Sequence, residues 1–436
     1  MTPADSTEAL TAGRAQAPTP ACPPVEPGVP ERGRKIRQGA FGAALAIAVL
    51  HGVNDAYASF LHPLLPRLMS RLDLSIADAA VLTTTLAVSA ALAQPLFGHL
   101  SDLRGRRILI AAGPAATGAF LSLMGLASGF GILILVLVLG GLGSAAFHPA
   151  AAATAARVTA GRGSGLRHAV FSFGGAIGYA AGPLVAVLVV GWRGLEGMWV
   201  AMLPAFLLAG ALWFALPADP VRDRAARGRH PDATDGRRPP LKRRAGTLFA
   251  GPIALVFGIS ALTAFVQRVF LTMEPIVMAG AGKSEIAGAA ALTLYLGAQA
   301  AGTLSGGWLA DRVDRRNLLV GITLLSFPAY FLALWFPPGG ATSLVFVAMA
   351  GALGMAALPP IVVIAQEAAP GRAALNSGIV MGLAWATGSV GVLGAGVLGD
   401  MLGARAAALA CTPVVLVATA LALHPALAGY RRPMGD

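Results

Sequence analysis

Polar residues interrupt an apolar segment near the start of the chain. Within residues 40–66 they are His51, Asn54, Asp55, Ser59 and His62. At about 100° of rotation per residue, an α-helix would place them within an arc of about 140°, so they form one stripe. A buried carboxyl group beside an imidazole is suited to proton exchange. We therefore identify His51, Asn54 and Asp55 as candidates for proton coupling or substrate binding. The alternative is that Asp55 braces a neighbouring helix.

A second polar group lies in the apolar segment 248–279. Gln267 and Glu274 share one helical face, and Arg268 follows about 100° round from Gln267. An arginine inside a bilayer needs a partner, so we expect Arg268 to face Asp55, Glu274 or an anionic substrate. A counter-charge for substrate is the favoured interpretation, and an internal structural pair is the alternative.

His148 lies deep in a third apolar segment, within GLGSAAFHP at 141–149. It is a candidate proton relay, although a hydrogen-bonded core histidine is an equal alternative. Further polar side chains in apolar segments are Gln94, Gln299, Gln366 and Glu367. The last two lie near the end of their segment, where water is within reach.

The composition indicates which solvent surrounds these residues. Of 436 residues, 56% are hydrophobic and 12% are charged, whereas soluble domains carry about 25% charged residues. A bilayer is therefore the main solvent, and the net charge of +12 does not indicate nucleic-acid binding. The two cysteines, Cys22 and Cys411, have no spacing typical of a disulfide framework or a metal site.

The hydropathy pattern predicts an all-α membrane protein with twelve transmembrane helices in two six-helix bundles. We place the spans at 40–66, 77–100, 107–128, 130–156, 165–190, 196–216, 248–279, 285–310, 317–336, 341–367, 373–399 and 404–424. The predicted organisation is a disordered tail (1–38), an N-terminal bundle (39–217), a linker (218–247), a C-terminal bundle (248–425) and a second tail (426–436).

The placement of basic residues predicts the orientation. Most of the 32 Lys and Arg residues fall on the side that carries both tails and the linker, and positive charge marks the cytoplasmic side. We therefore expect both termini to be cytoplasmic and the protein to lie in the plasma membrane as a multi-pass protein.

The two halves of the sequence align with each other at a nearly constant offset. Shifts of about 209 to 211 residues bring together Pro66 and Pro275, Ser75 and Ser284, Asp102 and Asp311, and Pro149 and Pro360. Such a pattern indicates an internal duplication of the kind found among secondary transporters, in which two parallel repeats make up the protein.

A charged hairpin occurs at the same point of each half. The first copy is GHLSDLRGRR at 98–107 and the second is GGWLADRVDRR at 306–316. The first copy resembles the G-x-L-x-D-x-x-G-R-R loop of the major facilitator superfamily, and the second matches it less well because Asp314 stands where that family has Gly. The matching residues that we expect to act in gating are Gly98, Asp102, Gly105, Arg106, Arg107, Asp311, Arg315 and Arg316.

This resemblance implies a fold and a mechanism. Two six-helix bundles would enclose a central cavity and rock to expose it alternately to each side. The aspartate and arginines of the loop would latch the cytoplasmic ends of the two halves together. For one hairpin alone, an equal alternative is that the arginines only enforce topology.

A narrower resemblance covers most of the N-terminal half. HGVND (51–55), GLGSAAFHP (141–149) and FSFGGAIGYAAGPL (171–184) are similar to the fosmidomycin-resistance family of drug exporters. An acidic residue commonly follows FHP in that family, and Ala150 stands there instead, so the substrate does not carry over.

The segment 165–190 also contains part of a known motif. Gly178, Gly182 and Pro183 match the core of the antiporter motif of facilitator-type drug/proton exchangers, without the Gly pair that usually follows. The motif favours export, and close helix packing is an equal alternative.

Several other classes of function are excluded by the sequence. GAGKS at 280–284 lacks the earlier Gly of an ATP-binding loop, and HExxH, GxSxG and CxxC are absent from the sequence. We therefore expect no enzymatic activity, cofactor, metal, ATP or nucleic acid, and a monomer whose partners are a small-molecule substrate, protons and the lipid bilayer.

The sequence thus predicts a major-facilitator-type secondary transporter. The favoured function is proton-coupled efflux of a small drug-like or anionic molecule, with Asp55 as proton carrier, His51 and His148 as assistants and Arg268 as counter-charge. The alternatives are proton-coupled or facilitated uptake of an organic acid or other metabolite, and a membrane sensor without turnover.

Overall fold

The structure is a computed structural model that describes residues 31–104, 106–158, 164–215, 251–369 and 372–430. Of residues 31–44, 102–104, 156–158, 164–169, 215 and 374, only the backbone belongs to the described part. Residues 1–39 and 40–436 form separate units. Of the first, the described part is the start of a helix that begins at Glu31, within the segment expected to be a tail.

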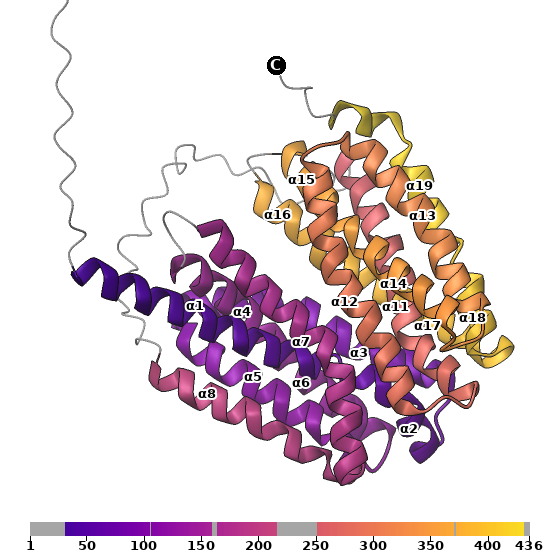
Figure 1. The fold of residues 1–436 in the computed structure, drawn as a ribbon, viewed down its shortest axis with the longest axis horizontal. Coiled ribbons are helices and arrows are strands. Elements are labelled where there is room, and N and C mark those ends of the chain that lie inside the picture. The colour runs from indigo at the N-terminus through magenta and orange to yellow at the C-terminus, as the bar shows by residue number, and fades with distance from the viewer. Residues whose placement is uncertain (1–30, 105, 159–163, 216–250, 370–371, 431–436) are drawn as a thin grey trace, which may run out of the picture. The chain divides into compact units, whose positions relative to one another are not determined.

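The first half of the chain forms a bundle of helices, coloured indigo to magenta in Figure 1. Its helices are α1 (Glu31–Ala58), α2 (Leu61–Leu72), α3 (Ile76–Leu92), α4 (Gln94–Arg104), α5 (Arg106–Ser122), α6 (Phe130–Val158), α7 (Ser164–Arg193) and α8 (Leu203–Ala215). A short 3₁₀ segment, Leu123–Leu126, extends α5, and another, Glu196–Met202, precedes α8.

The second half forms a bundle coloured salmon to yellow. Its helices are α11 (Pro252–Gly280), α12 (Glu285–Ala310), α13 (Arg315–Trp335), α14 (Ala341–Ala356), α15 (Leu358–Ala368), α16 (Ala373–Gly378), α17 (Ala384–Leu402), α18 (Ala404–Cys411) and α19 (Val414–Ala422). A π-helical turn, Ile379–Leu383, joins α16 to α17, and a 3₁₀ segment, Pro425–Tyr430, follows α19.

Among the described residues, ten helices are long and apolar enough to cross a membrane. The other two predicted spans correspond to α1 with α2 and to α12. The helix is interrupted between Ala58 and Leu61, so the first span is formed by two helices. The second, α12, has 26 residues, about 39 Å of helix, but is rich in Ala and Gly.

The start of the second span of each half shows the duplication in three dimensions. Ser75 caps α3 by accepting a hydrogen bond from the Asp78 backbone N–H at 3.1 Å. Ser284 caps α12 in the same way, through the Ala287 N–H at 3.2 Å. A cap satisfies an otherwise unpaired N–H of the first turn. The aligned serines therefore begin equivalent helices.

The charged hairpins are also equivalent in structure. Arg107 donates to the carbonyl of Trp213 at the end of α8, and its guanidinium lies 4.4 Å from that indole ring. Arg316 donates to the carbonyl of Leu423, directly after α19. In each bundle, then, the hairpin arginine binds the last free carbonyls of the sixth span, where a cation is favoured by the helix dipole.

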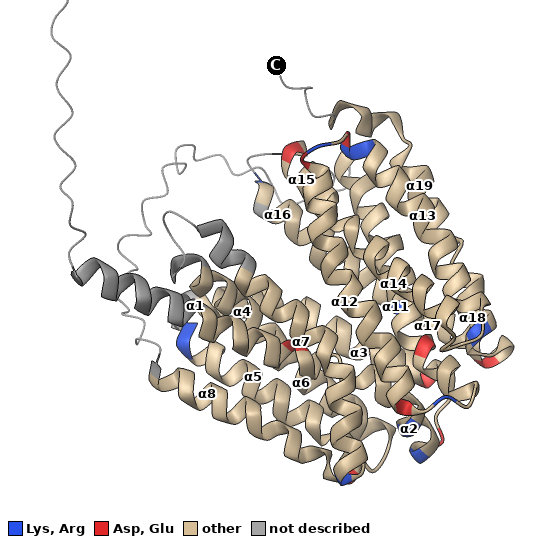
Figure 2. Cartoon of the chain, in the orientation of Figure 1, with Lys and Arg blue, Asp and Glu red and all other residues tan. Residues whose placement is uncertain are grey.

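We call the end of the bundles at which α8 ends and α11 begins the linker end, and the opposite end, with the turns at 73–75 and 281–284, the far end. Charged residues gather at these two ends, and the middle of the helices is almost free of them (Figure 2). The bundles touch chiefly through α3 with α17 and α7 with α12. At the far end, Arg67 of the first bundle pairs with Glu285 of the second at 2.7 Å.

Candidate functional site

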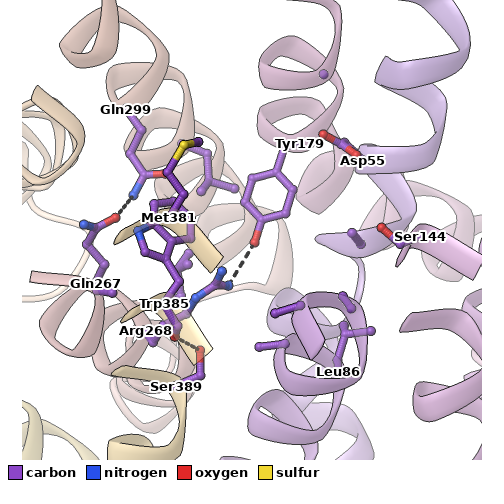
Figure 3. Close-up of a pocket in the computed structure, with 18 of the residues that line it drawn as sticks. Asp55, Leu86, Ser144, Tyr179, Gln267, Arg268, Gln299, Met381, Trp385 and Ser389 are labelled. Atoms are coloured by element: carbon purple, nitrogen blue, oxygen red, sulfur yellow. Dashed lines mark hydrogen bonds between the residues drawn. The ribbon is translucent and has the colours of Figure 1, made fainter. Parts of the chain in front are cut away.

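A cavity of about 470 Å³ lies between the two bundles, a volume within the range of sites for drug-sized ligands. One wall comes mainly from α1, α3, α6 and α7, and the other mainly from α11, α12 and α17. Its polar lining includes Asp55, His62, Gln94, Ser144, His148, Tyr179, Gln267, Arg268, Gln299 and Ser389. Figure 3 shows many of these side chains directed into the same space.

Asp55 is the centre of a hydrogen-bonded cluster on the first wall. Its carboxylate lies 3.2 Å from His51 Nε2 and 3.2 Å from His148 Nε2, one imidazole on each oxygen. The Asn54 amide donates to Oδ1 of Asp55 at 3.0 Å and to Ser144 Oγ at 3.4 Å. The candidates His51, Asn54, Asp55 and His148 therefore form one site.

The two imidazoles are held from behind by backbone carbonyls. His51 Nδ1 lies 2.9 Å from the Phe171 carbonyl, and its ring stacks on the Phe171 ring at 4.3 Å. His148 Nδ1 lies 2.8 Å from the Ser144 carbonyl, one turn earlier in α6. Because a carbonyl only accepts, both Nδ1 atoms carry a proton. This fixes the tautomer of both rings and directs Nε2 at Asp55.

Glycines allow α7 to approach α1 closely enough to complete this site. A Cβ on Gly178 would collide with the Gly52 carbonyl, and one on Gly182 with Ser59 Oγ. A Cβ on Gly175 would lie 2.5 Å from the His51 ring. Gly178 and Gly182 of the antiporter-like motif thus pack closely against α1, and Gly175 beside them leaves room for the His51 ring.

The second wall carries the cation. Arg268 on α11 has its guanidinium 5.6 Å from the Trp385 ring, and it donates to the Tyr179 hydroxyl of the other bundle at 3.5 Å (Figure 3). No ion pair of Arg268 occurs within the described residues. Its positive charge faces the cavity, so an anionic group of a ligand is its natural partner.

Two glutamines beside Arg268 are fixed in orientation. Gln267 donates through Nε2 to the Gly354 carbonyl at 3.1 Å and accepts from Gln299 Nε2 at 3.1 Å (Figure 3). Both side chains line the cavity. Gln267 and Gln299 therefore present polar atoms to a ligand in a defined direction.

Glu274 and Ala150 lie away from the cavity lining. Glu274 is buried, and its Oε2 has no hydrogen-bond partner among the described residues. Ala150 is completely buried in an apolar cluster with Ile47, Phe147 and Phe171. An acidic side chain at this position would enter that cluster, which explains why alanine fits here.

The hairpin candidates lie at the linker end. Arg106 donates to the Ala153 carbonyl at 3.5 Å. Nη1 of Arg315 donates to both carboxylate oxygens of Glu367, Oε1 at 2.8 Å and Oε2 at 2.7 Å. Each of these contacts stays within one bundle. A Cβ at Gly98 would lie 3.6 Å from the Pro149 side chain, which is ordinary contact. Gly105 and the Asp102 side chain lie outside the described part of the chain.

Asp314 shows why the second hairpin departs from the motif. Its carboxylate accepts a hydrogen bond from the Asn317 backbone N–H at 2.8 Å and so caps α13. An aspartate at this place stabilises the helix start. Asp311, the aligned acidic residue, directly follows the last residue of α12.

Sequence reasoning missed several residues of the site. Ser144 lies one helical turn before His148, a spacing that is visible in the sequence. Tyr179 and Trp385 carry no such signal, because only the packing of the two bundles brings them to Arg268.

A His–Asp–His group is also able to hold a metal ion. The ligand atoms of His51, Asp55 and His148 lie within 4.8 Å of one another, the one such group among the described residues. The 3.2 Å nitrogen–oxygen distances are equally those of proton-bridged contacts. The absence of a metal stays a prediction.

Two bundles of membrane-spanning helices around one central polar cavity define a secondary transporter. In agreement, the family model described as "Major Facilitator Superfamily" matches residues 47–292 and 253–433. The chain belongs to the major facilitator superfamily. The predicted family and the twelve-helix, all-α fold are confirmed.

Two curated relatives cover most of the chain. It is 28% identical over 372 residues to the fosmidomycin resistance protein of Escherichia coli (strain K12), covering 83% of this chain and 87% of that protein. It is 27% identical over 369 residues to the uncharacterized MFS-type transporter YfnC of Bacillus subtilis (strain 168), covering 82% and 87%.

Solved structures share the fold at low identity. One is a bacterial homolog of the human lysosomal transporter Spinster in an inward-facing, unoccupied conformation, with a TM-score of 0.76, 16% identity, and 91% and 99% of the two chains covered. Another is a D-xylose–proton symporter, with a TM-score of 0.65, 15% identity, and 88% and 97% covered.

Proposed function

We propose that this transporter exports a small organic molecule, drug-like or anionic, in exchange for protons. The observation that carries the proposal is the pairing of two opposite walls. The first presents a carboxylate between two imidazoles, and the second presents the Arg268 cation without an ion pair among the described residues. The first wall is suited to carry protons and the second to attract a negative group.

The relationship with the fosmidomycin resistance protein supports export. A protein that confers resistance by transport removes its substrate from the cell, and the match extends over most of both chains. The drug itself, fosmidomycin, is therefore the first probe to try. We expect the protein to lie in the plasma membrane as a monomer, with the linker end and both termini cytoplasmic.

The cycle requires that the bundles close alternately at each end. At the far end they are held by Arg67 with Glu285 and by Thr272, which donates to Thr83 Oγ1 at 3.1 Å. These contacts join the two bundles and must break for the far end to open. At the linker end we propose that Asp102, Arg106 and Arg107, with Asp311, Arg315 and Arg316, form the opposing latch.

Proton exchange is tested in inside-out membrane vesicles with an acidified lumen. When fosmidomycin or a member of a panel of small organic anions is added outside, an exporter of that compound should release protons from the lumen, which a pH-sensitive dye reports. An Asp55→Asn variant should retain its fold and lose this release, because an amide cannot carry the exchanged proton. A His424→Gln variant, altered at an exposed site, is the control.

The opposite results have definite meanings. Proton movement into the lumen on addition of substrate would indicate that substrate and protons travel together, as in uptake. A purified, folded protein that never moves the probe or a panel of organic anions across vesicles would favour a sensor without turnover.

A further inference from the structure

The cluster around Asp55 determines how many protons one transport cycle can move. We propose that it binds two protons, one in each imidazole–carboxylate contact, and that both are exchanged for one substrate molecule. This inference rests on the proposed proton coupling and adds its stoichiometry.

The argument begins with the tautomers. The carbonyls of Phe171 and Ser144, at 2.9 and 2.8 Å, each receive the proton on Nδ1 of a histidine. The neutral form of each ring therefore has only a lone pair on Nε2. That lone pair faces an oxygen of Asp55 at 3.2 Å in both contacts.

Each contact is a hydrogen bond only if a proton lies in it. Without one, a nitrogen lone pair faces a carboxylate oxygen, which is repulsive. Whether the proton resides on Nε2 or on the carboxyl group does not alter the count, because two contacts need two protons. One proton would leave the other contact unpaired in a buried place.

The charge balance follows from this count. With both protons bound, the cluster has a charge of +1, from two imidazolium groups and one carboxylate. After both have left, the charge is −1, from two neutral rings and the carboxylate. The two protons enter from the far end and leave toward the linker end, while one substrate molecule travels the other way.

The surroundings contribute few other charges. Across the cavity, α11 presents Arg268, and on the first wall α7 presents the Tyr179 hydroxyl and α2 presents His62. The titratable residues of α3, α4 and α5, which pack near α6, lie at or near helix ends, such as Asp78, Arg106 and Arg107; His99 on α4 is exposed. The cation of Arg268 disfavours the +1 state of the cluster, so it favours departure of the protons.

The geometry also gives an order of release. His148 lines the cavity and its side chain is 31% exposed, whereas the His51 side chain is 10% exposed and does not line it. The proton beside His148 has direct access to the cavity. The proton beside His51 must pass through the Asp55 carboxylate, so it leaves second.

The first test needs no substrate. The full-length protein, labelled with ¹⁵N-histidine in lipid nanodiscs, is titrated by NMR, with His51→Gln and His148→Asn used to assign signals. Both rings should be in the Nδ1–H form at high pH and both should become imidazolium at low pH. An Nε2–H form of either ring, or signals that change on addition of a chelator because a metal is bound, would overturn the proposal.

The second test counts protons during transport. In proteoliposomes with the membrane potential held at zero, the pH gradient that balances a known gradient of the substrate probe gives the number of protons per substrate. We expect two for the natural protein and one for His51→Gln, with His424→Gln remaining at two. A value of one for the natural protein refutes two-proton binding, whereas no substrate-driven proton movement at all would refute the proposed coupling instead.

Discussion

The Asp400 carboxylate accepts a hydrogen bond from the Ile76 backbone N–H at 2.7 Å. Asp400 lies in the last turn of α17 and Ile76 begins α3, so the end of a helix in one bundle caps the start of a helix in the other. The Ala77 N–H lies 3.3 Å from the same carboxylate. Unpaired N–H groups at a helix start favour an anion. The far end is therefore closed partly by a cap that crosses between the bundles.

We predict that Asp400→Ala shifts the protein toward opening at the far end. Loss of an exposed charge-assisted hydrogen bond costs about 1 kcal/mol, so the open population should rise about fivefold. Spin labels on cysteines at Asp73 and Lys283, with Cys22 and Cys411 replaced by serine, would report the distance between the bundles. Asp78→Ala is the matched control, because the Asp78 carboxylate accepts from the Ser75 backbone N–H at the start of the same helix and not from the other bundle. An equal effect of Asp78→Ala would contradict the role of Asp400.

The Arg67–Glu285 pair should behave as a reversible charge contact. Both side chains are about one-third exposed, so the pair contributes at most about 1 kcal/mol. Arg67→Glu should place two like charges together and reduce flux severalfold, and the double variant Arg67→Glu with Glu285→Arg should restore it. Flux of the substrate probe in proteoliposomes measures both. If the double variant is no better than the worse single one, the pair does not act as a contact between the bundles.

Gly178→Ala should destabilise the protein through helix packing. The added methyl would collide with the Gly52 backbone, which cannot move aside as a flexible side chain can, and such overpacking costs about 1–3 kcal/mol. The apparent Tm in detergent should fall by several degrees. Gly191→Ala on the same helix is the control, because its added methyl meets open space. Equal Tm values for the two variants would show that the helices can separate without cost.

Arg268 should determine selectivity for charge. Arg268→Gln should reduce transport of an anionic probe about tenfold, since hydrogen bonds to a charged group contribute about 1.5–3 kcal/mol. Arg268→Lys keeps the charge and loses the planar guanidinium near Trp385, so partial activity is expected. Vesicle transport of anionic and neutral probes measures the difference. As a control, Lys283→Gln removes an equal charge at the exposed far end and should leave selectivity unchanged. If Arg268→Gln reduced transport of neutral probes as much as that of anionic probes, Arg268 would have a structural role instead.

The transmembrane organisation was predictable because hydropathy is local. Apolar runs of sufficient length give the helices, and the offset between the halves gives the two bundles. The aligned serines Ser75 and Ser284 do cap equivalent helices, and the aligned arginines Arg107 and Arg316 bind equivalent carbonyls. The break between α1 and α2 was not predicted, because the apolar run continues through it.

The functional site was predictable only in part. Helical periodicity placed His51 and Asp55 on one face, and both are in the cluster. That His148 shares the same carboxylate depends on how α6 packs against α1, and that Arg268 meets Tyr179 depends on how the bundles meet. Contacts between residues about a hundred positions apart leave no pattern within a single segment.

The amino-acid sequence by itself therefore determined that the protein lies in a bilayer, where its helices run and that its two halves repeat. These features follow from the composition and from the order of residues along the chain. The tertiary structure decided which polar groups meet. Backbone carbonyls fix both histidine tautomers, glycine backbones set how near α7 comes to α1, and Asp400 reaches the start of α3. These are short-range interactions, and only packing of the helices brings their atoms within range.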